Sequence, residues 1–177
     1  MARKKLTIVP PSRWADTDLF VVRRSKIQGR GAFAARRIRK GQRIIEYIGR
    51  RISTEEADRK YADTPGKRHH TFLFTVDEHT VIDASYDYNK ARYINHSCDP
   101  NCEAVSEDGH IFIEAIRNIQ PGVELTYDYA FESDGPITEE DRRLYPCHCG
   151  SPKCRGTIIK PKRRRRKSRR SKRKKSR

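Results

Sequence analysis

Short apolar runs that end at turn residues recur along the whole chain. They are rich in β-branched and aromatic residues, which favour strands. The pattern predicts strands at residues 19–23, 43–47, 71–76, 80–83, 111–115 and 123–127. The third and fourth of these runs flank Asp77-Glu78-His79, an arrangement typical of a hairpin. Many short strands with turns between them predict a mainly β domain built from several small sheets.

Helical signals are few. Ser53 is followed three residues later by Glu56, a capping-box pattern that predicts a helix of about two or three turns ending before Pro65-Gly66. Residues 89–93 fit one further helical turn, and residues 1–18 are expected to form a loose arm. The helices are therefore expected to be minor additions to the β domain.

The positive charge is concentrated at the C-terminal end. The net charge is +17, and residues 160–177 contain 14 Lys or Arg and no acid. Residues 1–159 carry 26 basic residues against 23 acids, so their net charge is only about +3. A run of this kind cannot bury apolar surface and repels itself, so we expect residues 160–177 to be disordered when free. Neutralising phosphates releases counterions, which predicts that this tail binds nucleic acid; a solvated tail that only aids solubility is the alternative.

Nothing in the sequence predicts a membrane segment. No window approaches 18 apolar residues, and the apolar stretch 6–9 after the basic start is cut off by Pro10-Pro11, too short for a signal peptide. An odd number of clustered cysteines suits a reducing compartment and a metal better than disulfides. The five are Cys98, Cys102, Cys147, Cys149 and Cys154.

Three of these cysteines form a local metal-binding pattern. Cys147, Cys149 and Cys154 lie within eight residues, next to a glycine and a proline. Structural zinc is held by four ligands at tetrahedral corners, so one further ligand is needed. Cys98 and Cys102 are both candidates for the fourth ligand. The alternative is that all five thiols are free of metal.

Five short motifs occur in one order along the chain. They are Gly29-Arg30-Gly31, Tyr47-Ile48-Gly49, the segment 92–101 (RYINHSCDPN), the segment 124–129 (ELTYDY) and the segment 147–156 (CHCGSPKCRG). In order and spacing they resemble the SET-domain protein lysine methyltransferases with a post-SET cysteine segment, from about Leu19 to Ile158. The resemblance implies a SET fold of several small sheets, in which residues 95–98 thread beneath a neighbouring loop as a pseudoknot.

The resemblance also divides the chain. It implies an N-terminal arm at 1–18, a SET domain at 19–131, a connector at 132–146, a post-SET zinc segment at 147–159 and the basic tail at 160–177. Cys98 would be the fourth zinc ligand, clamping the C-terminal segment onto the loop at Asn95-His96. Cys102 would then be a small buried hydrophobic residue.

The activity implied is methyl transfer from S-adenosylmethionine to a lysine amine. Free lysine has a pKa of about 10.4, so the pocket must desolvate the ammonium group and align the neutral amine. By resemblance, Tyr129 is the tyrosine nearest the reacting centre, Tyr127 limits the number of methyl groups, and Tyr47 is a further pocket residue. Taken singly, each tyrosine in a strand is as well explained by packing.

The cofactor residues follow from the same resemblance. Arg30 and Gly31 in the glycine turn would let the backbone approach the methionine portion closely. The residues implied to line or contact the cofactor are Arg92, Asn95 and His96, with Gln28 and His148 at further positions. His69 and His70 are expected to be solvated loop residues.

Two departures limit the resemblance. Phe72 stands where many relatives carry an active-site tyrosine, which puts the product specificity in doubt, and no cysteine-rich segment precedes Leu19. The expected protein substrate is a basic chromosomal protein, or this chain's own tail. The competing hypothesis is a catalytically silent SET module that binds nucleic acid. The compact chain favours a bacterial cytoplasm or nucleoid, with the nucleus as the alternative.

Overall fold

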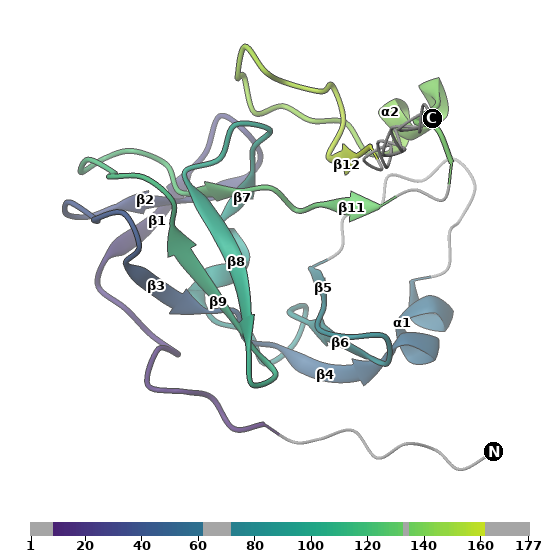
Figure 1. The fold of residues 1–177 in the computed structure, drawn as a ribbon, viewed down its shortest axis with the longest axis horizontal. Coiled ribbons are helices and arrows are strands. Elements are labelled where there is room, and N and C mark those ends of the chain that lie inside the picture. The colour runs from purple at the N-terminus through teal and green to yellow at the C-terminus, as the bar shows by residue number, and fades with distance from the viewer. Residues whose placement is uncertain (1–8, 62–71, 133–134, 162–177) are drawn as a thin grey trace, which may run out of the picture.

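The protein consists mainly of short strands. In the computed structural model, which describes residues 9–61, 72–132 and 135–161, twelve strands form five small sheets. Two α-helices and one 3-10 turn complete these parts of the chain (Figure 1). The prediction of a mainly β, SET-type fold of small sheets is confirmed.

Three of the sheets are antiparallel. β1 (Phe20–Arg24) and β2 (Arg30–Ala34) form a hairpin. The strands of the second sheet, in the order β3-β9-β8, are β3 (Arg43–Glu46), β9 (His110–Ala115) and β8 (Cys102–Glu107). The strands of the third, in the order β4-β6-β5, are β4 (Arg50–Ser53), β6 (Thr80–Asp83) and β5 (Leu73–Thr75).

Two parallel pairs join segments that are distant in the sequence. β7 (Asn95–His96) pairs with β10 (Thr126–Tyr127), and the amide of Ser97 donates to the carbonyl of Tyr127 at 3.1 Å. β11 (Phe131–Glu132) pairs with β12 (Ile159–Lys160) and so brings the end of the cysteine segment beside the SET motifs. The first pair lies where the resemblance placed the pseudoknot.

Local sequence signals predicted two of the three helical elements. α1 (Thr54–Lys60) begins after Ser53, whose hydroxyl accepts from the Glu56 amide at 3.1 Å, as the capping pattern predicted. The predicted turn is the 3-10 helix η1 (Lys90–Tyr93). α2 (Glu139–Leu144) was not anticipated in the connector, although Thr138 and Asp141 form a full capping box there.

The strand predictions were partly correct. The hairpin of β5 and β6 is confirmed, but the run at 123–127 was predicted too long, since only β10 is a strand there. β2, β4 and β8 were missed, as were the two-residue strands β7, β11 and β12. β2 consists of Arg30-Gly31-Ala32-Phe33-Ala34, which has weak β propensity, and it pairs along its whole length with β1.

The core lies between the β1–β2 hairpin, the β3-β9-β8 sheet and the loops that follow β2 and β9. Its largest fully buried side chains include Phe20, Ile38, Ile45, Ile113 and Leu125. The expected loose arm is docked on this body from Ser12 onward. The Ser12 amide donates to Glu46 Oε2 at 2.7 Å, and Asn89 Nδ2 donates to the Ala15 carbonyl at 2.7 Å. In the parts of the chain described, no helix is both long and apolar enough to cross a bilayer.

Asp83 is a buried charge with a stabilising set of donors. Its side chain is fully buried and accepts from Lys60 Nζ and the Tyr61 hydroxyl, both at 2.7 Å, and from the Ser85 amide at 2.9 Å. Burial alone would raise the pKa of Asp83, but these hydrogen bonds lower it to about 2.

We expect Asp83→Asn to lower the free energy of unfolding by about 2–4 kcal/mol at pH 7, because it removes one partner of a buried ion pair. The folded-state pKa lies below the unfolded value, so the stabilisation is complete above that value and is lost as the pH falls toward about 2. Denaturant unfolding of both proteins at several pH values measures this. A difference that stays constant down to pH 2 would contradict the assignment.

Candidate functional site

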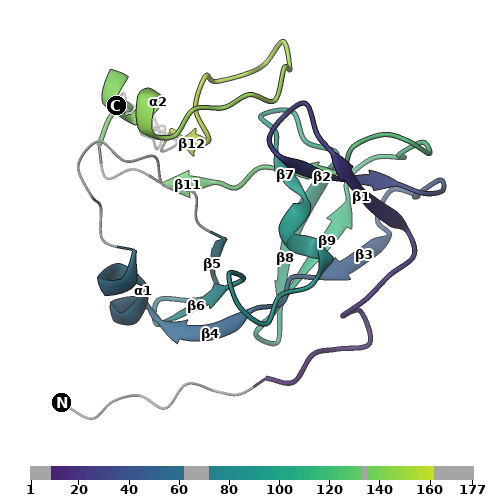
Figure 2. The ribbon, with the colours of Figure 1, turned by 180° about the vertical axis from the view of Figure 1, so that it is seen from behind.

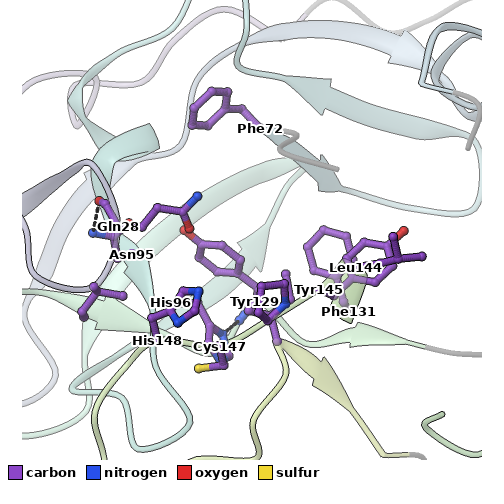
Figure 3. A pocket seen from close by; sticks show the side chains of 13 residues that line it. Gln28, Phe72, Asn95, His96, Tyr129, Phe131, Leu144, Tyr145, Cys147 and His148 are labelled. Atoms are coloured by element: carbon purple, nitrogen blue, oxygen red, sulfur yellow. Dashed lines mark hydrogen bonds between the residues drawn. The ribbon is translucent and has the colours of Figure 1, made fainter. Parts of the chain in front are cut away.

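Two cavities meet at one aromatic wall. The smaller has a volume of about 310 Å³ and the larger about 960 Å³, and Phe72, Tyr129 and Phe131 line both. Figure 3 shows the Tyr129 ring at the centre of the smaller cavity, with Phe72 above it and His96 and Cys147 below. Tyr129 is therefore part of the wall of both cavities.

The smaller cavity contains four of the predicted cofactor residues. They come from the β1–β2 turn, from β7 and from the cysteine segment, and they are Gln28, Asn95, His96 and His148. Leu144 and Tyr145 from α2 and its C-terminal cap close another side. Thus the connector, which the sequence left without a role, forms part of the wall.

Asn95 is held by a network that the sequence did not reveal. Its side-chain nitrogen donates to Glu124 Oε1 at 2.8 Å, and the carbonyls of Arg30 and Gln28 lie at 3.1 and 3.3 Å. Glu124 Oε1 also accepts from the Ser25 hydroxyl at 2.7 Å. Glu124 was quoted within the fourth motif but given no role; here it ties β7 to the β1–β2 turn beside the smaller cavity.

Gly31 and Arg30 make contacts in the structure that the sequence did not predict. A Cβ on Gly31 would lie 2.1 Å from Glu124 Oε1, so Glu124 occupies the space that the missing side chain leaves. The Arg30 guanidinium lies over the Tyr93 ring, 5.0 Å from its centre. Neither residue is among those that line the smaller cavity.

His96 is buried and neutral at pH 7. Its Nδ1 accepts from the Tyr129 amide at 3.1 Å, which places the proton on Nε2, 3.5 Å from Cys98 Sγ. Burial lowers the pKa of His96 to about 4, against the attraction of Asp128. The ring thus fixes the backbone of Tyr129 without carrying charge.

The three predicted tyrosines come together, and the ring of Phe74 lies against two of them. The rings of Tyr127 and Tyr129 lie 4.8 Å apart, and Phe74 lies 5.4 Å from Tyr47 and 6.3 Å from Tyr127. The Tyr129 hydroxyl donates to the Ile94 carbonyl at 3.0 Å, and the Tyr47 hydroxyl donates to the Phe72 carbonyl at 3.2 Å. Burial raises the pKa of all three tyrosines, so their hydroxyls are neutral.

Arg92 is among the residues that line the larger cavity and not among those that line the smaller one. Its guanidinium stacks on two rings, 3.7 Å from the centre of Phe72 and 4.0 Å from that of Tyr88. Cation–π attraction of this kind stabilises the pair and holds Phe72 between the cavities. Phe72, the position at which a tyrosine was expected, is therefore part of the dividing wall.

Four cysteine sulfurs form a cluster beside the smaller cavity. The Sγ atoms of Cys98, Cys147, Cys149 and Cys154 all lie within 4.8 Å of one another, and those of Cys98 and Cys147 are 3.7 Å apart. Tetrahedral zinc with thiolates at about 2.3 Å requires sulfur separations of about 3.8 Å. The amides of Arg155 and Gly156 donate to the sulfurs of Cys98 and Cys154 at 3.3 and 3.4 Å. The donor set and spacing fit one zinc ion.

The structure places Cys98, and not Cys102, beside the three local cysteines. Cys102 is fully buried in β8, where its thiol lies 3.4 Å from Asn101 Oδ1, and burial raises its pKa to about 12. It does not belong to the cluster, whereas Cys98 does. The cysteine segment is also held by Arg155, which forms a bidentate ion pair with Asp128, with both N···O distances at 2.9 Å.

Fold and site together define a β-rich protein whose two aromatic cavities share a tyrosine and adjoin a four-cysteine cluster. The chain belongs to the SET domain family, whose model matches residues 29–130. Three of the four clustered cysteines, Cys147, Cys149 and Cys154, stand where the family's post-SET segment was expected, and Cys98 joins them from the SET domain.

The relatives are much longer proteins. The chain is 46% identical over 136 residues to histone-lysine N-methyltransferase trr of Drosophila melanogaster, which covers 75% of this chain and 5% of that protein. It is 43% identical over 138 residues to human histone-lysine N-methyltransferase 2B, covering 76% and 5%. It is 43% identical over 143 residues to rice histone-lysine N-methyltransferase TRX1, covering 76% and 13%. These animal and plant relatives give no support to the predicted bacterial location.

Proposed function

We propose that this chain is an S-adenosylmethionine-dependent protein lysine N-methyltransferase that acts on histones or similar basic chromosomal proteins. The observation that carries the proposal is the pair of cavities sharing Tyr129, since transfer between two substrates requires that they meet at one point. The names of the relatives supply the reaction and the substrate class.

The smaller cavity is the proposed donor site. Gln28, Asn95, His96 and His148 would contact S-adenosylmethionine, which supplies an electrophilic sulfonium methyl group. Arg30, Gly31 and Arg92 would act from outside this lining. Arg30 and Gly31 would do so through the turn that Asn95 and Glu124 hold, and Arg92 by fixing Phe72.

The larger cavity is the proposed lysine site. Its aromatic lining, with Tyr47, Tyr127 and Phe74, would pack against the lysine stem and favour the neutral amine by desolvation. The Tyr129 hydroxyl donates its hydrogen bond to the Ile94 carbonyl, so its oxygen lone pairs are available for weak C–H···O contacts. A zinc ion at the cysteine cluster would serve structure, because it would hold Cys147 and His148 against the donor site.

The basic tail is the proposed tether. Residues 160–177 would bind nucleic acid, which would keep the enzyme on chromosomes. Of these residues, 162–177 lie outside the part of the chain that the structure describes, so this proposal rests on their charge. The catalytically silent module is the alternative function.

The deciding experiment is incubation of the chain with radiolabelled S-adenosylmethionine and core histones. We expect label on lysine in the histones, abolished in the Tyr129→Phe variant. A well-folded protein that binds S-adenosylmethionine or nucleic acid but transfers no label to histones or to itself would support the silent module instead.

A second outcome concerns the number of methyl groups. Tyr127 lines the larger cavity beside Tyr129, with Tyr127 only 6% exposed. We expect Tyr127→Phe to retain activity and shift products toward higher methylation, because removing the hydroxyl frees space and a polar contact. Mass spectrometry of the products measures this. An unchanged methyl count would remove Tyr127 from the role of product switch.

The tail prediction is tested by salt dependence. A chain ending at Pro161 keeps β12 intact and removes 13 Lys or Arg residues. Each phosphate contact contributes a slope of roughly −0.9 in log affinity against log salt on duplex DNA. If about half of these cations engage phosphates, the full chain has a slope about six units steeper. Equal slopes for the two chains would show that the tail is not the tether.

A further inference from the structure

The basic tail leaves the folded body at the rim of the larger cavity. Lys160 lines this cavity together with Ala130 and Phe131. β12 lies beside β11 in both views (Figures 1 and 2), with Phe131 opposite Ile159 and Glu132 opposite Lys160. The segment that follows Lys160 therefore begins at a residue that lines the proposed lysine site.

The exit point is firmly anchored. Ile159 is buried at 4% exposure, and its amide donates to the Thr157 hydroxyl at 3.2 Å. The Ile158 amide donates to the Tyr145 carbonyl at 3.1 Å, and Thr157 is itself fully buried. Because these hydrogen bonds and this burial fix β12, the start of the tail stays at the cavity.

The cavity carries exposed negative charge at two places. Asp58 on α1 and Glu103 on β8 both line it, and both are exposed. Within residues 9–61, 72–132 and 135–161, neither carboxylate takes part in an ion pair. Among the described residues that line the cavity, the cations are Arg92, which is stacked on aromatic rings, and Lys160 at the exit of the tail. An arginine-rich segment entering this opening would meet complementary charge.

The tail is long enough to return to the cavity. Its lysines beyond the exit are Lys162, Lys167, Lys172, Lys174 and Lys175. An extended chain spans at most about 3.3–3.6 Å per residue, so Lys167 can reach about 25 Å from Lys160. A segment tethered this way has an effective concentration in the millimolar range when the span is matched. Lys162 is too close to turn back after Pro161, which favours the four later lysines.

We propose that residues 162–177 are a substrate of the larger cavity and are methylated in cis by the same chain; this rests on the proposed methyltransferase function. In the step, a tail lysine loses its ammonium proton to solvent, and its Nζ lone pair forms a bond to the methyl carbon of the sulfonium donor. The carbon–sulfur bond breaks, and its electron pair stays on sulfur as a thioether. The tail is thus an internal competitor of external basic substrates.

The test uses the full chain with labelled S-adenosylmethionine and no other protein, with peptide mapping of residues 160–177. We expect methyl groups on the tail lysines. Because a reaction within one chain does not depend on protein concentration, the fraction of chains labelled per minute should not change when the protein is diluted about 100-fold. A reaction between chains would slow about 100-fold instead, which would overturn the cis assignment. A matched variant with all five tail lysines changed to arginine keeps the charge and should lose the label while still methylating histones.

Two mixtures separate the outcomes. When the Tyr129→Phe chain is mixed with the active lysine-to-arginine variant, no label should appear on the tail of the inactive chain; label there would show transfer between molecules. The double variant Asp58→Asn, Glu103→Gln should lower self-methylation about 3- to 10-fold at low salt. If histones are methylated and the tail is not, this inference fails while the proposed function stands; if neither is methylated, both fail.

Discussion

The Tyr129→Phe variant is expected to transfer methyl groups at least about 100-fold more slowly than the parent chain, the size of effect typical for loss of one preorganised polar group at a reacting centre. Tyr129 is the tyrosine that lines both cavities. Its hydroxyl is oriented by the Ile94 carbonyl at 3.0 Å, and its amide is fixed by His96. The position of the oxygen is therefore set by the fold and not by the substrate.

The fold should tolerate this change. Phenylalanine keeps the ring contact with Tyr127 and loses one hydrogen bond, worth about 1 kcal/mol. Tyr93→Phe is the matched control, since Tyr93 packs against Tyr88 outside both cavities. Single-turnover rates and thermal melting on the three proteins test the assignment. Equal rates for Tyr129→Phe and Tyr93→Phe would remove Tyr129 from the reacting centre.

Removal of zinc is expected to have the largest effect on the folded state. One equivalent of zinc per chain should be bound by Cys98, Cys147, Cys149 and Cys154. Binding free energy at such a site is folding free energy, and structural zinc contributes about 10–16 kcal/mol in small peptides. Chelation should therefore lower the melting temperature by at least about 10 °C.

Chelation should also weaken S-adenosylmethionine binding. Cys147 and His148 belong to the wall of the smaller cavity, and Cys98 connects them to β7 and its Asn95-His96 segment. Cys98→Ala should reproduce the effect of a chelator on both stability and binding. Cys102→Ala is the control, because Cys102 packs in β8 outside the cluster and its loss should leave the zinc content at one. Active protein without zinc, measured by metal analysis, would contradict the assignment.

Local signals in the sequence determined much of the fold and the chemistry of the site. The hairpin of β5 and β6 and the cap of α1 were predicted because their alternation and turn residues act over a few neighbouring positions. The three local cysteines predicted a metal cluster because their ligand spacing is short. The motifs at 92–101 and 124–129 identified the family because their residues are contiguous.

Long-range packing decided the rest. β2 becomes a strand only because β1 pairs with it, since its own residues have weak β propensity. The choice of Cys98 over Cys102 depended on which thiol faces the distant cysteine segment, and a spacing of four residues cannot show this. Arg92 lies in the larger cavity because Phe72 and Tyr88 clamp its guanidinium there.

The sequence by itself determined the small-sheet β fold, the family, the tyrosines of the pocket and the charge of the tail, because each depends on residues that are close together in the sequence. Only the tertiary structure showed that Gly31 leaves room for Glu124, that two cavities share Tyr129, and that Lys160 lies at the rim of the larger one. These features arise where segments far apart in the chain come into contact. Such contacts are fixed by mutual packing and hydrogen bonding of the whole fold, which no local pattern records.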